Sequence, residues 1–130
     1  LMRSQAEQKG LHLEFELESA LPSVNADAAN MEGVFTNLIS NAIKYTPEGG
    51  RVRVVGKREG DYIRIDVQDT GIGISEKDLP RIFERFYRVK TEKTRQIVGT
   101  GLGLSIVKQV VDAHLGTIDV QSVENQGTLF

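Results

Sequence analysis

Hydrophobic and polar residues alternate strictly near the start of the chain. The apolar positions are Leu11, Leu13, Phe15 and Leu17, and the polar positions between them are His12, Glu14, Glu16 and Glu18. Alternation with a period of two predicts a strand that has one face in the core and one in solvent. His12 falls on the solvent side of this strand.

The period then changes to that of a helix ending near Tyr45. An apolar stripe is formed by Met31, Phe35, Leu38 and Ala42, with the spacing expected of a buried helix face. Asp27 is a candidate N-cap. The sequence TPEGG that follows Tyr45 ends the helix.

A second, polar stripe lies on the same helix. Asn37, Asn41 and Lys44 are spaced i, i+4 and i+7, so they lie on one face, about a third of a turn from the apolar stripe. Two amide oxygens and one ammonium group in a row suit a metal–phosphate ligand. A cation near a helix C-terminus is also favourable in itself, which gives Lys44 a structural alternative.

The remaining patterns predict further strands and helices. Strands are expected at Arg51–Lys57 and Tyr62–Asp69, joined as a hairpin through Gly60. A short helix from Ser75 or Asp78 through Phe86, a long helix from about Gly101 to Ala113, and strands at Gly116–Ser122 and from Gly127 to Phe130 complete the list. Strands and helices interleave while one strand pair is a hairpin, which predicts an α/β sandwich, with a mixed sheet and helices packed on one face.

Composition limits the classes of function. A chain of 130 residues that is 39% hydrophobic and 26% charged is typical of one globular domain. The absence of cysteine excludes disulfides and cysteine-based metal sites. A net charge of -2 argues against nucleic-acid binding, and no apolar run is long enough for a membrane span. Lys and Arg nevertheless outnumber Glu from Arg81 to Arg95, which fits either a solvated surface or a site for an anion.

Asp69 ends the second strand of the predicted hairpin. It shares the parity of Ile63, Ile65 and Val67, so its carboxylate should point inward, where it needs hydrogen-bond partners. The TGIG sequence that follows turns the backbone sharply. Two interpretations stay open: a carboxylate that accepts a purine amino group, and a carboxylate that caps the turn.

A glycine-rich run, Gly99–Leu104, leads into the last helix. Exposed N–H groups at a helix N-terminus favour phosphate. The spacing matches neither a dinucleotide fingerprint nor a P-loop, so a flexible hinge is the alternative. Phe83, Phe86 and Tyr87 either anchor the basic loop before this run or stack on a ligand. We expect His114 to be structural.

In chain order, four groups of residues resemble the catalytic ATP-binding domain of two-component sensor histidine kinases. They are Asn37, Asn41, Ala42, Lys44 and Tyr45; then Asp69, Gly71 and Gly73; then the FERFYR sequence ending at Arg88; then GTGLGL at 99–104. The resemblance covers residues 11–130. It implies the kinase–gyrase–chaperone (Bergerat-type) ATPase fold, with a mixed, mostly antiparallel five-stranded sheet backed by three helices.

The resemblance also implies roles for single residues. Asn41 would ligate Mg²⁺ through its amide oxygen, Asn37 would line the metal–phosphate region, and Lys44 and Arg88 would approach phosphate. For adenine, the resemblance implies that Asp69 accepts the amino group and that Tyr45 packs against the ring. It also implies that Thr128 lies near the adenine, and that Gly71 and Gly73 leave room for the nucleotide. Residues from about 89 to 100 would form the ATP lid, closed by Gly99, Thr100, Gly101, Leu102 and Gly103.

One position separates branches of this superfamily. The hydrolysing members carry a glutamate, the general base, four residues before the metal-binding asparagine. Here that position is Asn37, which cannot accept a proton at neutral pH. The resemblance therefore implies slow hydrolysis and transfer of the γ-phosphate to another nucleophile.

These kinases carry a phosphoacceptor histidine beside Glu or Asp on a helix. Neither His12 nor His114 has such a sequence context. By resemblance, residues 1–10 are the tail of a linker from a dimerisation and phosphoacceptor domain. The implied partners are that domain and the receiver domain of a response regulator, and the implied setting is a cytoplasmic, monomeric domain of a homodimeric parent. The alternatives are a slow ATPase or nucleotide switch, a serine kinase of the anti-sigma-factor type, and an interaction module without nucleotide.

Overall fold

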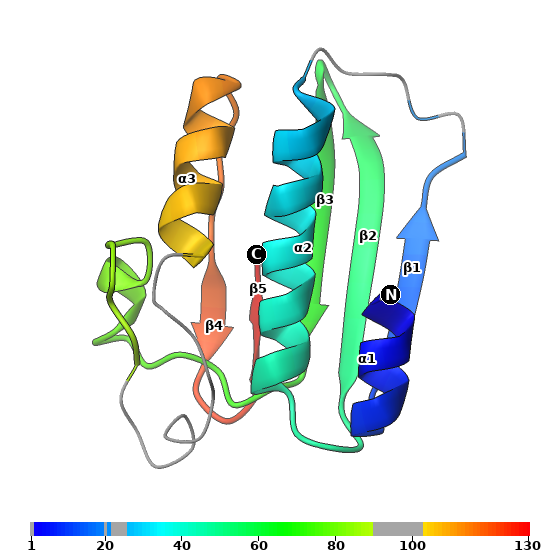
Figure 1. Cartoon of the computed structure of the whole chain (residues 1–130), viewed down its shortest axis with the longest axis vertical. Coiled ribbons are helices and arrows are strands. Elements are labelled where there is room, and N and C mark those ends of the chain that lie inside the picture. Colours follow the sequence, from blue (N-terminus) through cyan, green and yellow to red (C-terminus); the bar gives the residue numbers. More distant parts are fainter. Residues whose placement is uncertain (1, 20, 22–25, 90–102) are drawn as a thin grey trace.

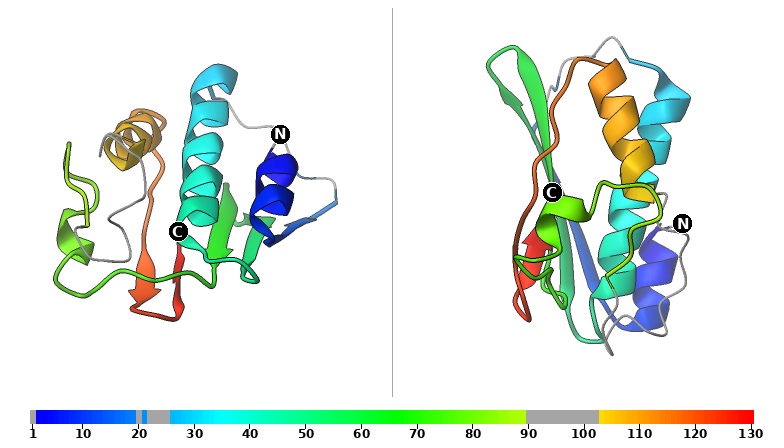
Figure 2. Two further views of the ribbon diagram at one scale, coloured as in Figure 1. Left: turned by 60° about the horizontal axis from the view of Figure 1, so that its bottom comes forward. Right: turned by 90° about the vertical axis from the view of Figure 1, so that its left-hand side faces the viewer.

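The computed structural model describes residues 2–19, 21, 26–89 and 103–130, which form a sheet covered by helices on one face (Figure 1). The order of the described elements is α1 (Met2–Lys9), β1 (His12–Leu17), α2 (Ala28–Tyr45), β2 (Arg51–Glu59), β3 (Tyr62–Asp69), the 3-10 helix η1 (Leu79–Arg81), α3 (Gly103–Ala113), β4 (Gln121–Val123) and β5 (Gly127–Leu129). Figure 2 shows α1, α2 and α3 together on one side of the sheet.

The sheet has the strand order β1-β2-β3-β5-β4. β1 and β2 are parallel, and the other neighbouring strands are antiparallel. The predicted α/β sandwich, with a mixed, mostly antiparallel five-stranded sheet and three helices on one face, is confirmed. The predicted hairpin is also present, although β2 runs on to Glu59 and the chain turns at Gly60, which has a φ of 59°.

The core lies between α2 and the inner faces of β1, β2 and β3. Leu38 and Ala42 of the predicted apolar stripe are buried, whereas Met31 and Phe35 are only partly buried. The buried residues of α2 are Val34, Leu38, Ile39, Ala42 and Ile43. The buried face is wider than predicted because α2 has α1 on one flank and α3 on the other.

The N-terminus of α2 is fixed by two residues. Asp27 caps it as predicted, since its Oδ1 accepts a hydrogen bond of 3.0 Å from the N–H of Asn30. The N–H of Asp27 donates to Nε2 of His114 at 3.0 Å, and Nδ1 of the same ring lies 2.8 Å from the carbonyl oxygen of Val110. His114 therefore ties the end of α3 to the start of α2, which is the structural role expected of it.

Two predicted elements are shorter than expected. The helix predicted through Phe86 is reduced to η1. The turns that follow are closed by i to i+3 bonds, such as Glu84 N–H to Arg81 O, and Phe86 has a φ of 65°, which no helix residue adopts. The strand predicted at Gly116–Ser122 is β4, Gln121–Val123. Its first residue, Gln121, pairs with Leu129, which is the last residue of β5. The residues before Gln121 therefore have no β5 residue to pair with.

The open face of the sheet is polar. Arg51 pairs with Glu14 at 3.4 Å, Arg53 pairs with Glu16, and Arg64 pairs with Asp66 at 3.0 Å. Such exposed pairs contribute little stability and mark this face as solvated. None of the described helices has the length and apolar character needed to cross a membrane.

Candidate functional site

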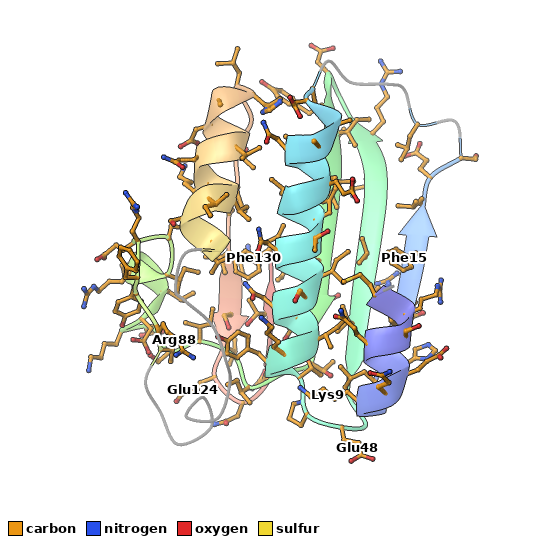
Figure 3. All side chains as sticks on the ribbon, viewed as in Figure 1. Lys9, Phe15, Glu48, Arg88, Glu124 and Phe130 are labelled. Atoms are coloured by element: carbon orange, nitrogen blue, oxygen red, sulfur yellow. The ribbon has the colours of Figure 1, made fainter. Side chains whose placement is uncertain are left out.

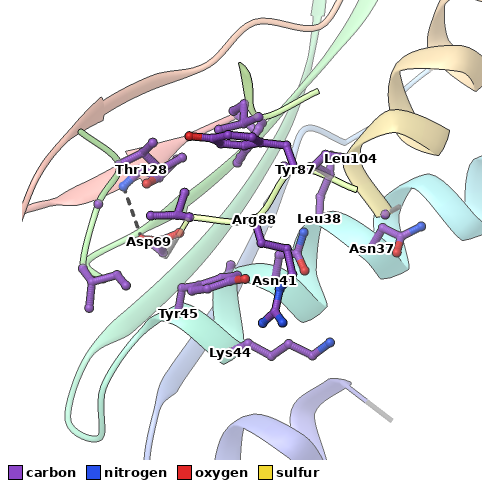
Figure 4. A pocket seen from close by; sticks show the side chains of 18 residues that line it. Asn37, Leu38, Asn41, Lys44, Tyr45, Asp69, Tyr87, Arg88, Leu104 and Thr128 are labelled. Carbon is purple, nitrogen blue, oxygen red and sulfur yellow. Dashed lines mark hydrogen bonds between the residues drawn. The ribbon is translucent and has the colours of Figure 1, made fainter. Parts of the chain in front are cut away.

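A cavity of about 350 Å³ opens between the C-terminal half of α2, the ends of β3 and β5, and the start of α3 (Figure 4). Its lining includes many residues singled out from the sequence: Asn37, Asn41, Lys44, Tyr45, Asp69, Gly73, Arg88, Gly103 and Thr128. These residues come from separate elements, and the fold brings them together around one space.

The helix side of the cavity is the polar stripe of α2. Asn37 and Asn41 are half-buried, and Lys44 is exposed. Neither amide group makes a hydrogen bond to another described residue, and the ammonium group of Lys44 has no ion-pair partner among them. The oxygens and the charge on this side are therefore available to a ligand.

Asp69 forms the opposite side, at the end of β3. The predicted parity is confirmed, since Val67 is buried while Arg64 and Gln68 are exposed. Oδ1 of Asp69 accepts a hydrogen bond of 2.8 Å from the N–H of Gly71. It also accepts one of 3.2 Å from the N–H of Thr128, which is dashed in Figure 4. Burial raises the pKa of this carboxyl group, and the two N–H groups act in the opposite direction.

The two oxygens of Asp69 divide the two roles that the sequence left open. Oδ1 caps the turn through Gly71 and joins β3 to β5 through Thr128. Oδ2 makes no hydrogen bond within the described residues. The same carboxylate therefore caps the turn with Oδ1 and keeps Oδ2 as a free acceptor beside the cavity.

The turn after Asp69 needs glycine for reasons of backbone packing. Gly71 is buried and does not line the cavity. A Cβ at this position would collide with the carbonyl oxygen of Tyr45. Gly73 has a φ of 71°, and a Cβ there would collide with the backbone of Val123. This close packing brings the side chains of Ile72 and Ile74 into the cavity wall.

The segment before residue 90 contributes Tyr87 and Arg88 to the lining. The hydroxyl of Tyr87 donates a hydrogen bond to the carboxylate of Asp78, which also accepts one of 2.7 Å from Oγ of Ser75. These hydrogen bonds hold the pKa of Asp78 below its ordinary value. The guanidinium group of Arg81 lies 4.4 Å from the centre of the Tyr87 ring. Tyr87 is therefore an anchor that also faces the cavity.

The other two aromatic residues of this segment differ from Tyr87. Phe83 packs edge-on against Phe130, with 6.3 Å between the ring centres. Phe86 is 65% exposed and has a φ of 65°. Anchoring therefore describes Phe83 as well as Tyr87, and Phe86 makes no comparable packing contact with another ring among the described residues.

The start of α3 lies beside the polar stripe of α2. Gly103 lines the cavity, and a Cβ on it would lie 3.1 Å from Oδ1 of Asn37. The first N–H groups of a helix lack helical partners and favour anions. The predicted contacts Gly99, Thr100, Gly101 and Leu102, with most of the predicted lid, lie outside the described residues.

The sequence indicated an apolar wall beside Asp69 but not the residues that form it. It is made of Leu38, Ala42, Ile72, Ile74, Ile82, Leu104 and Phe130. In the sequence, Leu38 and Ala42 have the spacing of core residues, so the only signal was their closeness to the polar stripe. A cavity with an apolar wall and polar groups at two ends suits a flat base joined to a charged group.

The helix side of the same lining also offers oxygen atoms to a metal ion. The described residues contain no cluster of three His, Cys, Asp or Glu side chains. The oxygens nearest the helix side are the amides of Asn37 and Asn41. Mg²⁺ accepts such neutral oxygens when phosphate oxygens and water complete its shell, so the donor set fits a metal carried in with a phosphate ligand.

The chain is similar in sequence and in fold to known proteins. Residues 26–130 match the family described as histidine kinase-, DNA gyrase B-, and HSP90-like ATPase. Sensor histidine kinase WalK of Bacillus subtilis (strain 168) is 47% identical over 107 residues, which cover 81% of this chain and 18% of that protein. Full-length ShkA in complex with AMPPNP has a TM-score of 0.84 and 33% identity, over 99% of this chain and 26% of ShkA. ThkA in complex with the response regulator protein TrrA has a TM-score of 0.78 and 25% identity, over 99% of this chain and 35% of ThkA.

Proposed function

This chain belongs to the histidine kinase-, DNA gyrase B- and HSP90-like ATPase family, as a catalytic domain of the sensor histidine kinase type, and from that premise we propose that it binds Mg²⁺–ATP and transfers the γ-phosphate to a histidine. The observation that carries the proposal is the polarity of one cavity. A half-buried carboxylate lies at one end, and a row of two amides and an ammonium group lies at the other.

Adenine binds at the Asp69 end. The free Oδ2 accepts a hydrogen bond from the amino group of adenine, while Oδ1 stays with Gly71 and Thr128. The ring lies against the apolar wall and Tyr45, which lines the cavity between the two ends (Figure 4). ShkA, which shares the fold, was crystallised with the ATP analogue AMPPNP, and this supports a nucleotide in the corresponding space.

The phosphates lie along the polar stripe of α2. Asn41, with Asn37 beside it, would hold Mg²⁺ through amide oxygens, and the ion would neutralise charge on the phosphates. Lys44 and Arg88 bring positive charge to the same end of the cavity. Phosphoryl transfer depends mainly on position and on charge stabilisation, which these side chains supply.

The chemistry of Asn37 supports transfer over hydrolysis. Activation of water needs a group that accepts a proton, and an amide does not do so at neutral pH. By the resemblance, Asn37 occupies the position of the general base in the hydrolysing relatives. It lies beside the start of α3. The domain therefore holds ATP until an external nucleophile arrives.

The nucleophile and the later acceptor belong to the whole protein. This chain spans 18% of WalK and 26% of ShkA. We place the phosphoacceptor histidine on a helical dimerisation domain of the parent protein, with residues 2–9 at the connection to it. The complex of ThkA with the response regulator TrrA supports a response regulator as the next acceptor.

The test combines this chain, the proposed helical dimerisation domain of its parent protein, and ATP labelled at the γ-phosphate. We expect label on the helical domain that is lost in acid and retained in alkali, and no label when the candidate histidine is replaced by glutamine. Acid-stable label would indicate a serine kinase. If the chain alone released free phosphate as fast as it labels the helical domain, that would indicate an ATPase.

A further inference from the structure

Lys9, the last residue of α1, reaches across to the end of α2 (Figure 3). Its Nζ donates hydrogen bonds of 2.7 Å to the carbonyl oxygen of Ile43 and of 2.7 Å to that of Lys44. These carbonyls belong to the last turn of α2, where no following helical N–H group is available to them. One side chain on a different helix therefore closes this turn.

The other carbonyls of the turn also have partners from outside the regular helix ladder. Oγ1 of Thr46 donates to the carbonyl oxygen of Ala42 at 2.6 Å, and the N–H of Ile72 donates to that of Tyr45 at 3.1 Å. Of these contacts, those of Lys9 alone bring a charge. A cation is favoured at the negative end of a helix dipole, and hydrogen bonds from a charged donor are stronger than neutral ones.

The turn that Lys9 closes carries the ligand side of the cavity. Asn41, Lys44 and Tyr45 all lie within it or one residue before it, and all line the cavity. The ammonium group of Lys9 lies on the backbone side of this turn and is not part of the lining. It therefore acts on the ligand only through the position of the helix end.

The junction after Lys9 holds the same region. The N–H of Gly49 donates to the carbonyl oxygen of Gly10 at 2.9 Å, and the N–H of His12 donates to that of Gly50 at 3.0 Å. The segment from residue 9 to residue 12 thus contacts both the end of α2 and the loop that leaves it. Partial burial also lowers the pKa of Lys9, as expected for an ammonium group that has given up water for these carbonyls.

We propose that Lys9 is a positioning residue of the nucleotide site, which holds the last turn of α2 and thereby the phosphate-side contacts Asn41 and Lys44. The inference rests on the proposed binding of ATP and adds a residue from α1 to the elements that set its affinity. Without the ammonium group, two carbonyl oxygens lose their charged partner, and the turn gains freedom that ligand binding must remove.

The test measures two quantities on each variant of this chain: the dissociation constant of Mg²⁺–ATP by calorimetry and the free energy of unfolding by urea. Lys9→Met keeps the length of the side chain and removes the donors. We expect its dissociation constant to rise about tenfold, because part of the free energy of the two lost charge-assisted hydrogen bonds must then be supplied by ligand binding to order the turn. Lys9→Arg, which restores donors and charge, should return the constant to within about twofold of wild type. The matched control is Lys57→Met, at an exposed lysine of β2 away from the cavity.

A role in stability alone predicts a different result. Lys9→Met would then lower the free energy of unfolding but bind Mg²⁺–ATP with the wild-type constant, and that result overturns the inference. If Lys9→Met does not fold, Lys9→Gln takes its place under the same criterion. A wild-type chain that does not bind Mg²⁺–ATP overturns the proposed function, and this inference with it.

Discussion

The two ends of the cavity are built in different ways. At the end formed by β3 and β5, Asp69 is fixed by two backbone N–H groups, and the turn at 71–73 packs so closely that glycine is required. At the end formed by α2 and α3, Asn37, Asn41 and Lys44 make no side-chain hydrogen bonds to other described residues. The first end is shaped before a ligand arrives, whereas the second offers groups that a ligand must organise.

This difference assigns recognition of the base to the strand end of the cavity and phosphate chemistry to the helix end. A rigid acceptor selects one base at little cost in conformational entropy. Free amides and a free ammonium group accommodate a metal ion and a phosphate chain whose charge changes during transfer. Changes at the strand end should therefore affect stability or base recognition, and changes at the helix end should affect phosphate chemistry with little effect on stability.

Gly73→Ala should produce the largest effect, on stability. The new Cβ would collide with the backbone of Val123, and φ is 71°, so we expect a loss of about 3 kcal/mol in the free energy of unfolding. Urea unfolding measures it. The control is Gly33→Ala in α2, where a Cβ meets nothing within 4 Å and should stabilise by about 1 kcal/mol. Equal stability of the two variants would contradict the rigid strand end.

Asn41→Ala should produce the next largest effect, on phosphoryl transfer. Loss of the amide oxygen removes the proposed Mg²⁺ ligand, and we expect the transfer rate to fall by about 100-fold, as for other single electrostatic contacts in active sites. Binding of ATP without Mg²⁺ should change by less than about threefold. Thr36→Ala, on the exposed side of α2, is the control. A normal transfer rate in Asn41→Ala would remove this residue from the site.

Lys44→Met should weaken Mg²⁺–ATP binding by about tenfold, since it removes one charged contact to phosphate. Because Lys44 is exposed, the free energy of unfolding should change by less than about 0.5 kcal/mol. Calorimetry and urea unfolding give the two values, with Lys77→Met as an exposed control outside the cavity. A large loss of stability with normal affinity would assign Lys44 to capping of α2.

The smallest effect concerns pH. Burial raises the pKa of Asp69 in the folded state above its ordinary value of 3.8, so the folded state binds this proton more tightly than the unfolded chain does. The stability contributed by that proton is fully present at low pH and is lost as pH rises through the folded pKa. Without nucleotide, Asp69→Asn should therefore be slightly more stable than wild type at pH 7, and the difference should close toward pH 3.8. Urea unfolding of both proteins at several pH values tests this. The prediction is contradicted if the stability of the variant relative to wild type is lower at pH 7 than in acid.

Local periodicity predicted the parts of the fold that depend on neighbours in sequence. The period of two placed Asp69 on the inner face of β3, and the i, i+4, i+7 spacing placed Asn37, Asn41 and Lys44 on one face of α2. Contacts between distant segments were not predicted. Lys9 to α2 and Tyr87 to Asp78 both depend on how elements pack, and neither pair has a spacing that a single sequence reveals.

The same limit explains the errors in the elements. The helix expected through Phe86 is reduced to η1 because the next turns close with i to i+3 bonds and Phe86 is left-handed, although its composition favours a helix. The length of β4 depends on where β5 ends beside it. The residues of the apolar wall were not predicted because residues such as Leu38 and Phe130 serve both the core and the cavity.

We propose that the free oxygen of Asp69 recognises adenine in this cavity. This is tested by thermal unfolding of the chain with and without Mg²⁺–ATP, for wild type and for Asp69→Asn. Asparagine retains an oxygen for the N–H groups of Gly71 and Thr128 but can place a donor where adenine offers one. We expect ATP at a hundred times its dissociation constant to stabilise wild type by about 2.7 kcal/mol and to leave the variant unchanged. A folded wild-type chain that is not stabilised by millimolar Mg²⁺–ATP, or a variant stabilised as much as wild type, would contradict the claim.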